Sequence, residues 1–378
     1  MQQKIGIVGG GQLGKMLCMA AAPLSMHMIT MDKDPEAVSK GYSHEHIKGN
    51  PLDYDDVMSL GQKVDIITIE MENVNADALK DLKKQGKHVH PDPDALLTIQ
   101  DKGLQKQFFE KHNLPTSNFQ VFETLDDLMK TVESGKWEYP FVVKACRGGY
   151  DGQGVFMIDS LDDIKVLKEG RYLIEEKVNL QLELSVIVGR NGLGECVSFP
   201  TCALHTHAEA NLLSHMTAPA EISVELEGQA QNLAKQVMLA FNIQGVLAVE
   251  LFLDQENTLW INEVSPRPHN TGHHTIEAAY TSQYQQHLRG IANLPLGNPE
   301  QLKPAALLNV LGPSGGEGEP IYDGLDKLLQ MKGVYPHIYG KKKTKPHRKL
   351  GHITLLADST SELDALVEKV QSTITIRV

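Results

Sequence analysis

The alternation of short apolar runs with helix-like stretches in the first hundred residues constrains the fold more than any other sequence feature. The apolar runs predict strands, and the stretches between them predict helices. The strands are Lys4–Val8, His27–Met31, Asp65–Glu70 and His88–His90, and the helices are Gln12–Ala22, Leu52–Leu60 and Ala76–Gly86. Strands that alternate with helices imply a parallel sheet wound in βαβ units. We therefore predict an N-terminal parallel βαβ domain over residues 1–98.

The pattern changes near Thr116, where strands joined by tight turns become dominant. The predicted elements are the strands Phe141–Lys144, Val155–Ile158, Tyr172–Lys177, Leu182–Val188 and Glu195–Phe199, the helix Val224–Phe241, the strands Gly245–Asp254 and Thr258–Ser265, and a helix Thr275–Ile291. This pattern favours a mostly antiparallel α+β domain over residues 99–295. Further strands and a closing helix, Ser361–Ile374, predict a small C-terminal α/β domain over 296–378.

Charge and composition narrow the class of protein. A net charge of −12 over 378 residues argues against general nucleic-acid binding, which usually requires a basic surface. The four cysteines show no metal-ligand spacing, and reduced, buried thiols are expected. No apolar run is long enough to span a membrane, and the first residues lack the pattern of a signal peptide. We therefore expect a cytoplasmic protein without a membrane or nucleic-acid partner.

A glycine-rich turn, GGGQLG from Gly9 to Gly14, follows the first predicted strand and opens a helix, and Asp32 ends the second strand. This is the dinucleotide fingerprint in its usual context, so NAD(P) is one candidate ligand. A helix N-terminus also binds other anions, phosphate included, and the turn could equally serve packing alone. Glu70 and Glu72 end the third strand, where ribose hydroxyls are natural partners, although a solvated strand end is equally consistent.

A second glycine-rich segment, VVKACRGGYDGQG from Val142 to Gly154, indicates phosphate binding. Bare backbone N–H groups and one ammonium, that of Lys144, can surround a polyanion that bulky side chains would keep at a distance. The lysine precedes the glycines, so this is not the common P-loop.

The strongest deduction from the residues concerns Glu250 and Glu263. If the strands around Glu256-Asn257 form a hairpin, these two glutamates face each other with Cβ atoms about 4.5–5.5 Å apart. Two facing carboxylates in apolar strands are costly unless they are protonated or bridged by a cation, and oxygen ligands select Mg²⁺ or Mn²⁺. Asn262 joins such a site only through a bulge or twist. A solvated edge hairpin is the alternative.

Two further polar segments have a fixed place in the fold. The loop Asn262–Thr275 gathers Arg267, His269, Asn270, His273 and His274, which favours a polar substrate or phosphate cradle over a zinc site. The basic run Lys341–Lys349 ends at Arg348 and Lys349, beside a predicted strand. These two side chains could form charge-assisted bonds to a phosphate.

Together these motifs resemble the ATP-grasp superfamily and, within it, the family of 5-(carboxyamino)imidazole ribonucleotide synthetases of purine biosynthesis, the ATPase subunit of phosphoribosylaminoimidazole carboxylase. The resemblance covers essentially the whole chain. It rests on GGGQLGKM at 9–16, EMENV at 70–74, GGYDGQG at 148–154, EEKV at 175–178 followed by Glu183, NEVSPRPHNTGHHT at 262–275 and RKLGHI at 348–353. The 1–98 region then corresponds to a pre-ATP-grasp domain and 99–295 to the ATP-grasp domain.

The resemblance implies that ATP lies between two antiparallel sheets and that specific residues hold it. Lys102 and Lys144 would contact the phosphates, Glu175–Val178 would form the adenine-side hinge, and Glu183 would bind the ribose. The implied ATP-binding set is Lys102, Lys144, Gly149, Tyr150, Asp151, Gly152, Gln153, Gly154, Val155, Glu175, Glu176, Lys177, Val178, Glu183, His207, Asn262 and Glu263, with His205 as the alternative to His207. Glu250 and Glu263 would bind Mg²⁺.

The same resemblance implies a reaction. Bicarbonate attacks ATP to give carboxyphosphate and ADP, carboxyphosphate releases CO₂ in the closed site, and the amine of aminoimidazole ribonucleotide captures the CO₂. Tyr150, Asp151 and Arg267 are the implied catalytic residues. The implied ribonucleotide-binding residues are Gln12, Leu13, Glu72, Asn73, His269, Asn270, Arg348 and Lys349. A homodimer is expected from the family, and Lys102 replaces a more usual arginine, which loses the two-pronged donor.

Three alternative functions remain open from the sequence. A formate-dependent ribonucleotide transformylase or another carboxylate–amine ligase would keep the same fold. An NAD-dependent dehydrogenase would use Gly9–Gly14 and Asp32 but leaves Lys144 and the facing glutamates unexplained. A non-catalytic ATP-binding regulator would keep Lys144 and the carboxylates without substrate-dependent turnover.

Overall fold

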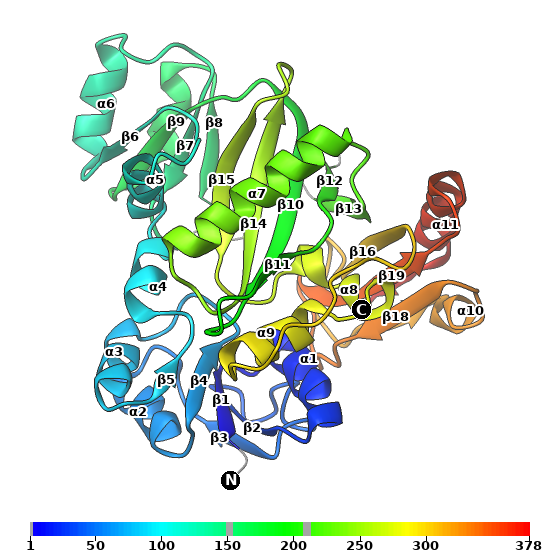
Figure 1. Cartoon of the computed structure of the whole chain (residues 1–378). Helices are drawn as coiled ribbons and strands as arrows, with labels where there is room; N and C mark the ends of the chain where they lie inside the picture. Colours follow the sequence, from blue (N-terminus) through cyan, green and yellow to red (C-terminus); the bar gives the residue numbers. More distant parts are fainter. Residues whose placement is uncertain (1–2, 149–153, 207–212) are drawn as a thin grey trace.

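The computed structural model of the chain describes residues 3–148, 154–206 and 213–378. Its N-terminal part is a five-stranded parallel sheet in the order β3-β2-β1-β4-β5 (Figure 1). The strands are β1 (Lys4–Val8), β2 (His27–Asp32), β3 (Glu45–Lys48), β4 (Ile66–Ile69) and β5 (His88–Val89). The prediction of a parallel sheet is confirmed. The short strand β3 was not predicted, because its sequence, EHIK, lacks an apolar run.

Helices cover both faces of this sheet. On one face α2 (Tyr54–Gln62) and α3 (Ala76–Lys84) bury Leu60, Leu79 and Leu82 against the strands. On the other face α1 (Gln12–Ala21) buries Leu17, and α9 (Gln283–Ile291), more than 250 residues later in the chain, packs beside it. The late helix therefore ties the N-terminal sheet to the rest of the molecule, as Figure 1 shows.

Two short helices lead out of the N-terminal sheet. They are α4 (Pro93–Ile99) and α5 (Lys102–Lys111), and each begins after an aspartate whose side chain accepts a backbone N–H, Asp92 and Asp101 respectively. A four-stranded antiparallel sheet follows in the order β6-β9-β7-β8. Its strands are β6 (Phe119–Phe122), β7 (Phe141–Ala145), β8 (Val155–Ile158) and β9 (Tyr172–Glu176), with α6 (Leu125–Glu133) and the 3₁₀ helix Leu161–Val166 packed on it.

A nine-stranded antiparallel sheet forms the centre of the molecule (Figure 1). Its path is β15-β14-β10-β12-β13-β16-β19-β18, and β11 pairs with β10. The strands are β10 (Leu180–Arg190), β11 (Cys196–Ser198), β12 (Cys202–Thr206), β13 (Leu213–Ala218), β14 (Gly245–Asp254), β15 (Leu259–Ser265), β16 (Ala305–Leu311), β18 (Val334–Ile338) and β19 (Lys349–Leu356). The long helix α7 (Val224–Ala240) packs on this sheet and buries Val237 and Met238 in its core.

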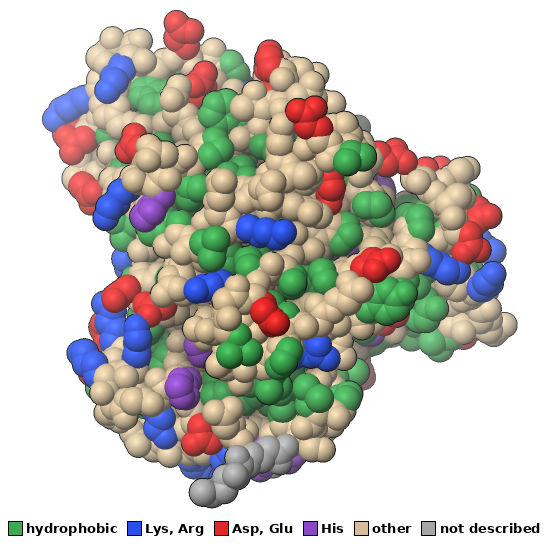
Figure 2. Space-filling model, in the orientation of Figure 1, with side chains coloured by type: hydrophobic (Ala, Val, Ile, Leu, Met, Phe, Trp, Pro, Cys, Tyr) green, Lys and Arg blue, Asp and Glu red, His purple; other side chains and the backbone are tan. Residues whose placement is uncertain are grey.

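The C-terminal strands continue the central sheet. Strand β13 pairs with β16, so the hydrogen-bonded ladder runs across residue 296. The helices α10 (Leu325–Leu328) and α11 (Thr360–Thr373) cover these strands, and β17 (Ile321–Asp323) pairs with β20 (Thr375–Arg377). In the space-filling view of Figure 2, acidic and basic side chains are interspersed over the face that α7 crosses.

One predicted helix is wrong. The stretch Thr275–Ile291 divides into α8 (Thr275–Ala278) and α9, because Ala279 is extended and Ser282 starts a new helix with a capping box to Gln285. Strands β6, β12 and β13 and helix α6 were not predicted. Among the described residues, no helix combines the length and the apolar character that crossing a membrane requires.

Candidate active site

The hairpin of β14 and β15 brings Glu250 directly opposite Glu263, as predicted. The turn differs from the prediction, however. The N–H of Asp254 donates to the carbonyl of Thr258 at 3.1 Å, so the loop inside this closing pair has three residues, Gln255 to Asn257, and Asn257 adopts the left-handed conformation at φ 61°. Near the turn, Leu251 therefore pairs with Ile261, and Glu250 would face Asn262 if this register continued.

A β-bulge at Asn262 restores the facing glutamates. The register shifts by one residue between Glu250 and Leu251, so Asn262 is the extra residue on its strand. Ile261 and Val264 stay in the core beneath α7, while the polar side chains of Asn262 and Glu263 both make contacts on the opposite side of the strand. The bulge that the sequence required for Asn262 to join the site is confirmed.

The facing glutamates have opposite electrostatic roles. Burial, followed by the charge of Glu263, raises the pKa of Glu250 to about 8. Burial acts in the same direction on Glu263, but the charges of Lys102 and Lys144 outweigh it and lower the pKa of Glu263 to about 2. The ammonium of Lys102 forms an ion pair with Glu263. One carboxylate is therefore paired, and the other is protonated or needs a cation.

This pair of carboxylates fits a magnesium ion better than zinc. Among residues 3–148, 154–206 and 213–378, no group of three or more His, Cys, Asp and Glu side chains has the geometry of a metal site. Mg²⁺ is commonly held by one or two carboxylates together with substrate phosphates, so two protein ligands are sufficient. A bound cation would relieve the unfavourable proximity of Glu250 to Glu263. The four cysteines are free, and Cys196 alone is not fully buried.

Lys144 connects the two antiparallel sheets. It lies in β7 of the four-stranded sheet, and its Nζ donates to Oδ1 of Asn262 in β15 at 2.8 Å and to Oε2 of Glu175 in β9 at 3.1 Å. The Glu175 carboxylate is buried, and although burial opposes it, the charges of Lys144 and Lys106 lower its pKa. The predicted phosphate lysine, the first hinge residue and Asn262 are thus brought together.

Lys106 is part of this network and was missed by the sequence analysis. It is 2% exposed, its Nζ lies 3.4 Å from Oε1 of Glu175, and it donates to Oγ1 of Thr116 at 2.6 Å. Burial lowers the pKa of Lys106 to about 8. Nothing in the sequence distinguishes Lys106 from the exposed Lys111 of the same helix except its position one turn after Lys102.

Helix α5 is anchored by Asp101, which determines where Lys102 lies. The Asp101 carboxylate accepts the N–H of Leu104 at 3.0 Å, pairs with Arg171, and accepts Nε of Arg147 at 3.1 Å. Arg147 directly precedes Gly148, the first glycine of the second glycine-rich segment, so Asp101 contacts both the start of α5 and this segment. The backbone N–H of Lys102 also donates to the carbonyl of Cys146 at 2.8 Å.

The remaining hinge residues lie at the end of strand β9 and directly after it. Glu175 points inward, whereas Glu176 and Lys177 are exposed and Val178 is half-buried. Oε2 of Glu176 accepts from Asn118 at 2.7 Å. Glu183 lies half-buried in β10, and burial raises its pKa while the charge of Lys144 opposes this, which places both groups in one electrostatic environment.

Some predicted ATP-binding residues fall outside the described residues. They are Gly149, Tyr150, Asp151, Gly152, Gln153 and His207. Gly154 is described, with φ 77°, and Val155 begins β8 opposite Lys144. His205, the alternative histidine, donates or accepts a hydrogen bond with Oγ1 of Thr217 at 2.9 Å and stacks on His215.

The first glycine-rich turn is occupied by a protein carboxylate. Oε1 and Oε2 of Glu70 accept the N–H groups of Gly11 at 2.5 Å and Gly14 at 2.6 Å, and Oδ2 of Asp32 accepts the N–H of Gly10 at 2.9 Å. A Cβ on Gly11 would lie 2.5 Å from Glu70, so glycine is required for this close approach. Burial raises the pKa of Glu70.

This arrangement contradicts two interpretations of the turn. The N–H groups that would bind a dinucleotide phosphate already have an anionic partner, and Glu70 is turned into the protein rather than toward a ribose. The glycines serve the packing of Glu70 against α1. Of the residues predicted to bind substrate here, Gln12 is half-buried and Leu13 is buried in the core with α9.

Glu72 forms the link to the Asn262–Thr275 loop. Its Oε1 lies 2.8 Å from a terminal guanidinium nitrogen of Arg267, in a pair whose side chains are only 26% and 17% exposed. Within the described part of the chain, Nε of Arg267 and Oδ1 of Asn270 are buried without a hydrogen-bond partner. Two such unsatisfied groups in one loop indicate a site that a polar ligand completes. Asn73, the next predicted residue, is exposed.

His269 joins this loop to the facing glutamates. Its Nε2 lies 3.4 Å from Oε1 of Glu250, and its Nδ1 is 3.0 Å from Oγ1 of Thr271. The other two histidines of the loop have structural roles: Nδ1 of His273 meets the Tyr284 hydroxyl at 2.8 Å, and Nδ1 of His274 meets the Thr271 carbonyl at 3.0 Å.

Arg348 and Lys349 enter from the C-terminal strands. Arg348 donates to the carbonyl of Lys343 at 2.8 Å, and Lys349 is the first residue of β19. Burial, followed by the charges of His352, His269 and Lys349, holds the pKa of His273 well below its usual range, so Lys349 acts on the same loop. Lys15 of α1 donates to the Ile338 carbonyl at 3.1 Å, which brings the glycine-rich turn beside these strands.

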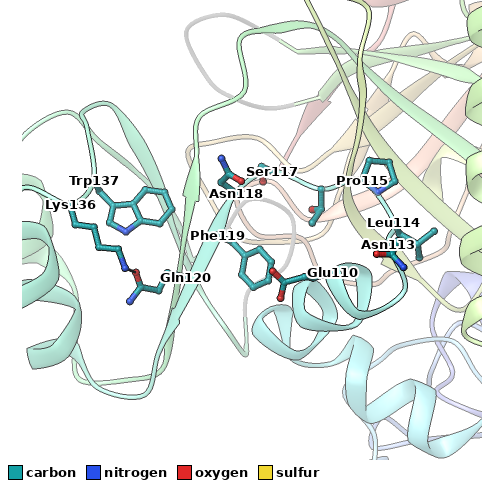
Figure 3. Close-up of a pocket in the computed structure, with 11 residues that line it drawn as sticks. Glu110, Asn113, Leu114, Pro115, Ser117, Asn118, Phe119, Gln120, Lys136 and Trp137 are labelled. Atoms are coloured by element: carbon teal, nitrogen blue, oxygen red, sulfur yellow. Dashed lines mark hydrogen bonds between the residues drawn. The ribbon is translucent and has the colours of Figure 1, made fainter.

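A separate hollow of about 440 Å³ lies between α5 and the four-stranded sheet (Figure 3). Phe119, Gln120, Lys136 and Trp137 line one part of it, and Asn113, Leu114 and Pro115 line the other. None of the predicted site residues lines this hollow. It shares only Ser117 and Thr116 with the network around Lys106.

Comparison with family models divides the chain into three matched segments. Residues 1–100 match the ribonucleotide synthetase preATP-grasp domain, residues 107–284 match the ATP-grasp domain, and residues 305–366 match the phosphoribosylaminoimidazole carboxylase C-terminal domain. The mixed α/β architecture that the sequence predicted agrees with these three models.

Individual relatives match over nearly the whole chain. The N5-carboxyaminoimidazole ribonucleotide synthase of Bacillus subtilis is 34% identical over 362 residues, which cover 95% of this chain and 92% of that protein. The phosphoribosylaminoimidazole carboxylase of Candida albicans is 35% identical, but the match covers 65% of its length.

Solved structures give the same result. N5-carboxyaminoimidazole ribonucleotide synthetase from Thermotoga maritima superposes with a TM-score of 0.91 at 34% identity over 99% of both chains. The synthase from Aspergillus clavatus, solved in complex with ADP and 5-aminoimidazole ribonucleotide, superposes with a TM-score of 0.89 at 30% identity over 98% of both chains.

Proposed function

This chain belongs to the N5-carboxyaminoimidazole ribonucleotide synthase family of ATP-grasp ligases, and we propose on that premise how its own residues perform the reaction. The activity of this family is the ATP-dependent synthesis of N5-carboxyaminoimidazole ribonucleotide in purine biosynthesis. The proposed substrates are ATP, bicarbonate and 5-aminoimidazole ribonucleotide, and the products are the carboxylated ribonucleotide, ADP and phosphate.

The observation that carries the proposal is the junction of the two antiparallel sheets. There Lys144 donates to Asn262, and Lys102 forms an ion pair with the next residue, Glu263. Two ammonium groups attract phosphate oxygens, and two carboxylates provide ligands for a divalent ion. A dinucleotide oxidoreductase would need none of these groups, and its phosphate site is taken by Glu70.

Mg²⁺, or Mn²⁺, is proposed at Glu250 and Glu263. When bound, such an ion neutralises charge that develops on the transferring phosphoryl group. The residues of this chain do the rest: Lys102 and Lys144 orient the phosphates, and the hinge Glu175–Val178 and Glu183 hold the adenosine. The segment Gly149–Val155, with Tyr150 and Asp151, is proposed to cover the nucleotide.

The ribonucleotide is proposed to bind on the N-terminal and loop side of the same junction. The Glu72–Arg267 pair, Asn73, His269 and Asn270 would form one wall. Gln12 and Leu13 in the first turn and Arg348 and Lys349 from the C-terminal strands would bind the ribose and phosphate end. Since Glu70 already holds the N–H groups of Gly11 and Gly14, the phosphate is assigned to Arg348 and Lys349 rather than to the helix N-terminus.

The proposed reaction has three steps. A bicarbonate oxygen attacks the γ-phosphorus, the bond to the β-phosphate oxygen breaks, and carboxyphosphate and ADP result. Carboxyphosphate then releases CO₂ and phosphate. The exocyclic amine attacks CO₂ and loses a proton, for which Asp151 is the proposed acceptor and Tyr150 and Arg267 are the proposed positioning groups.

We also propose a cytoplasmic homodimer with domains 1–98, 99–295 and 296–378. Figure 2 shows hydrophobic side chains over α1 and α9, and Met19 and Leu24 in this region are 46% and 45% exposed. Light scattering of the purified protein would give twice the 41.7 kDa chain mass for a dimer.

The test of the proposed function is ADP release with Mg²⁺-ATP and bicarbonate, with and without 5-aminoimidazole ribonucleotide. Strong stimulation by the ribonucleotide that depends on bicarbonate supports the carboxylating enzyme. Stimulation by formate in place of bicarbonate would assign the chain to transformylation instead. Nucleotide binding without turnover for any acceptor would leave a non-catalytic regulator.

A further inference from the structure

Helix α5 presents two ammonium groups to the nucleotide site, and the role of the second one is not explained by the proposed function. Lys102 and Lys106 are four residues apart and therefore lie on the same face of the helix. Lys102 pairs with Glu263. The side chain of Lys106 is only 3% exposed and is held by Oγ1 of Thr116 at 2.6 Å, Oγ of Ser117 at 3.2 Å and the carbonyl of Ile261 at 3.3 Å.

Glu175 lies between Lys106 and Lys144. Its Oε1 is 3.4 Å from Nζ of Lys106, and its Oε2 is 3.1 Å from Nζ of Lys144. Both lysines and the glutamate are buried, and buried charges in proteins are normally paired one to one. Here one carboxylate serves two ammonium groups, so the Lys106–Glu175–Lys144 triad carries a net charge of one positive unit.

The second contact of Lys144 shows where this excess charge is directed. Its Nζ donates to Oδ1 of Asn262, which adjoins Glu263 and Lys102 at the sheet junction. Asn262 is neutral. Of the two side-chain contacts described for the Lys144 ammonium, only the one with Glu175 is therefore with an anion. Without Lys106, Glu175 would neutralise Lys144 completely and hold its ammonium on the hinge side.

We propose that Lys106 is a positioning residue for nucleotide binding: by sharing Glu175, it keeps the triad positively charged and leaves the Lys144 ammonium available to phosphate oxygens. This inference rests on the proposed function, because it requires that Lys144 contacts nucleotide phosphates. It assigns to Lys106 no contact with the nucleotide itself.

The first test measures ADP binding by calorimetry, without turnover, in the Lys106→Gln variant. The glutamine amide keeps hydrogen bonds to the hydroxyls of Thr116 and Ser117 but removes the charge. Loss of one unit charge a few ångströms from Lys144 should weaken ADP binding by about 10- to 50-fold. Lys111→Gln, at the exposed end of the same helix, is the matched control and should bind ADP like the wild type.

A double variant separates this charge effect from a structural one. The reference for this comparison is Glu175→Gln alone, because Glu175 belongs to the proposed hinge. In that background no carboxylate retains Lys144, so adding Lys106→Gln should weaken ADP binding by no more than about threefold. A further loss as large as the one that Lys106→Gln causes in the wild-type chain would overturn the proposal.

Adenosine binding provides a readout that a general disturbance of the site would change. Adenosine carries no phosphate, so its affinity for Lys106→Gln, measured by the same calorimetry, should stay within about twofold of wild type. Weaker adenosine binding by this variant, or unchanged ADP binding, refutes the role of Lys106. If Lys106→Gln fails to fold, Lys106→Met takes its place. Failure of the wild type to bind ADP would instead refute the proposed function.

Discussion

The facing carboxylates predict that the metal-free protein is strained at Glu250. The folded-state pKa of Glu250 is about 8, whereas its ordinary value is 4.5. A group whose pKa is raised by folding contributes full stability below its unfolded value, and this contribution is lost as the pH rises toward its folded value. At pH 7 the carboxyl group is held protonated at a free-energy cost that the unfolded chain does not have.

The magnitude follows from the shift. One pKa unit corresponds to about 1.4 kcal/mol. Over the roughly 2.5 pH units between pH 4.5 and pH 7, the Glu250 carboxyl group is ionised in the unfolded chain but protonated in the folded one. The upper bound is therefore about 3 kcal/mol at pH 7. Glutamine at this position avoids the cost of protonation but must itself find hydrogen-bond partners, which reduces the gain to about 1–3 kcal/mol.

The assay is urea unfolding of wild type and Glu250→Gln in the presence of a chelator. At pH 7 the variant should be more stable than wild type by about 1–3 kcal/mol, and at pH 4.5 this advantage should be gone, so that the variant is at best as stable as wild type. The same variant should lose ribonucleotide-dependent turnover, because one of the two proposed metal ligands is gone. A variant that is less stable at pH 7, or a stability difference that does not change with pH, would refute the electrostatic reasoning.

Two other perturbations address the neighbouring groups. Glu72→Gln should raise the KM for the ribonucleotide about tenfold, because it breaks the half-buried ion pair with Arg267, and should leave the KM for ATP within about twofold. Steady-state kinetics with each substrate varied in turn would measure both values. A rise in the KM for ATP instead would contradict the assignment of Glu72 to the ribonucleotide. Glu70→Gln should lower the free energy of unfolding by about 1–3 kcal/mol, since one amide oxygen cannot serve the N–H groups of both Gly11 and Gly14. Unchanged urea unfolding of Glu70→Gln would show that the turn does not depend on this carboxylate.

The sequence contained enough to predict the glutamate pair, although part of the reasoning was wrong. A two-residue hairpin loop would place Glu250 opposite Glu263, but the loop has three residues and the bulge at Asn262 compensates for the difference. Turn length and bulges are set by local backbone conformation, here the left-handed Asn257, and a sequence pattern cannot distinguish the two registers. The prediction that Glu250 faces Glu263 was therefore correct, although the loop length from which it was derived was wrong.

The glycine-rich turn shows the opposite case. Its pattern predicts an anion at the helix N-terminus, and the structure has one, but that anion is Glu70 of the protein itself. The partner of a backbone N–H depends on a contact between residues 56 or more positions apart, which local sequence does not specify. Lys106 was missed for the same reason, because only the packing of α5 against Thr116 and Ile261 buries it.

The order of the motifs identified the fold class, and the parallel and antiparallel sheets are confirmed. Strands β12 and β13 were missed because their segment contains polar and histidine-rich residues that interrupt the apolar alternation. The helices α8 and α9 are separated by the capping box that Ser282 forms with Gln285. Serine and glutamine also occur inside helices, so the sequence did not reveal this break.

Bicarbonate is proposed to attack ATP at the site that contains Lys102, Lys144, Glu250 and Glu263. The most direct measurement uses bicarbonate labelled with ¹⁸O and follows the phosphate released in the presence of 5-aminoimidazole ribonucleotide. Attack by a bicarbonate oxygen predicts one ¹⁸O atom in each phosphate formed. Phosphate without ¹⁸O, released at the normal rate, would mean that water attacks ATP and would contradict the proposed reaction at this site.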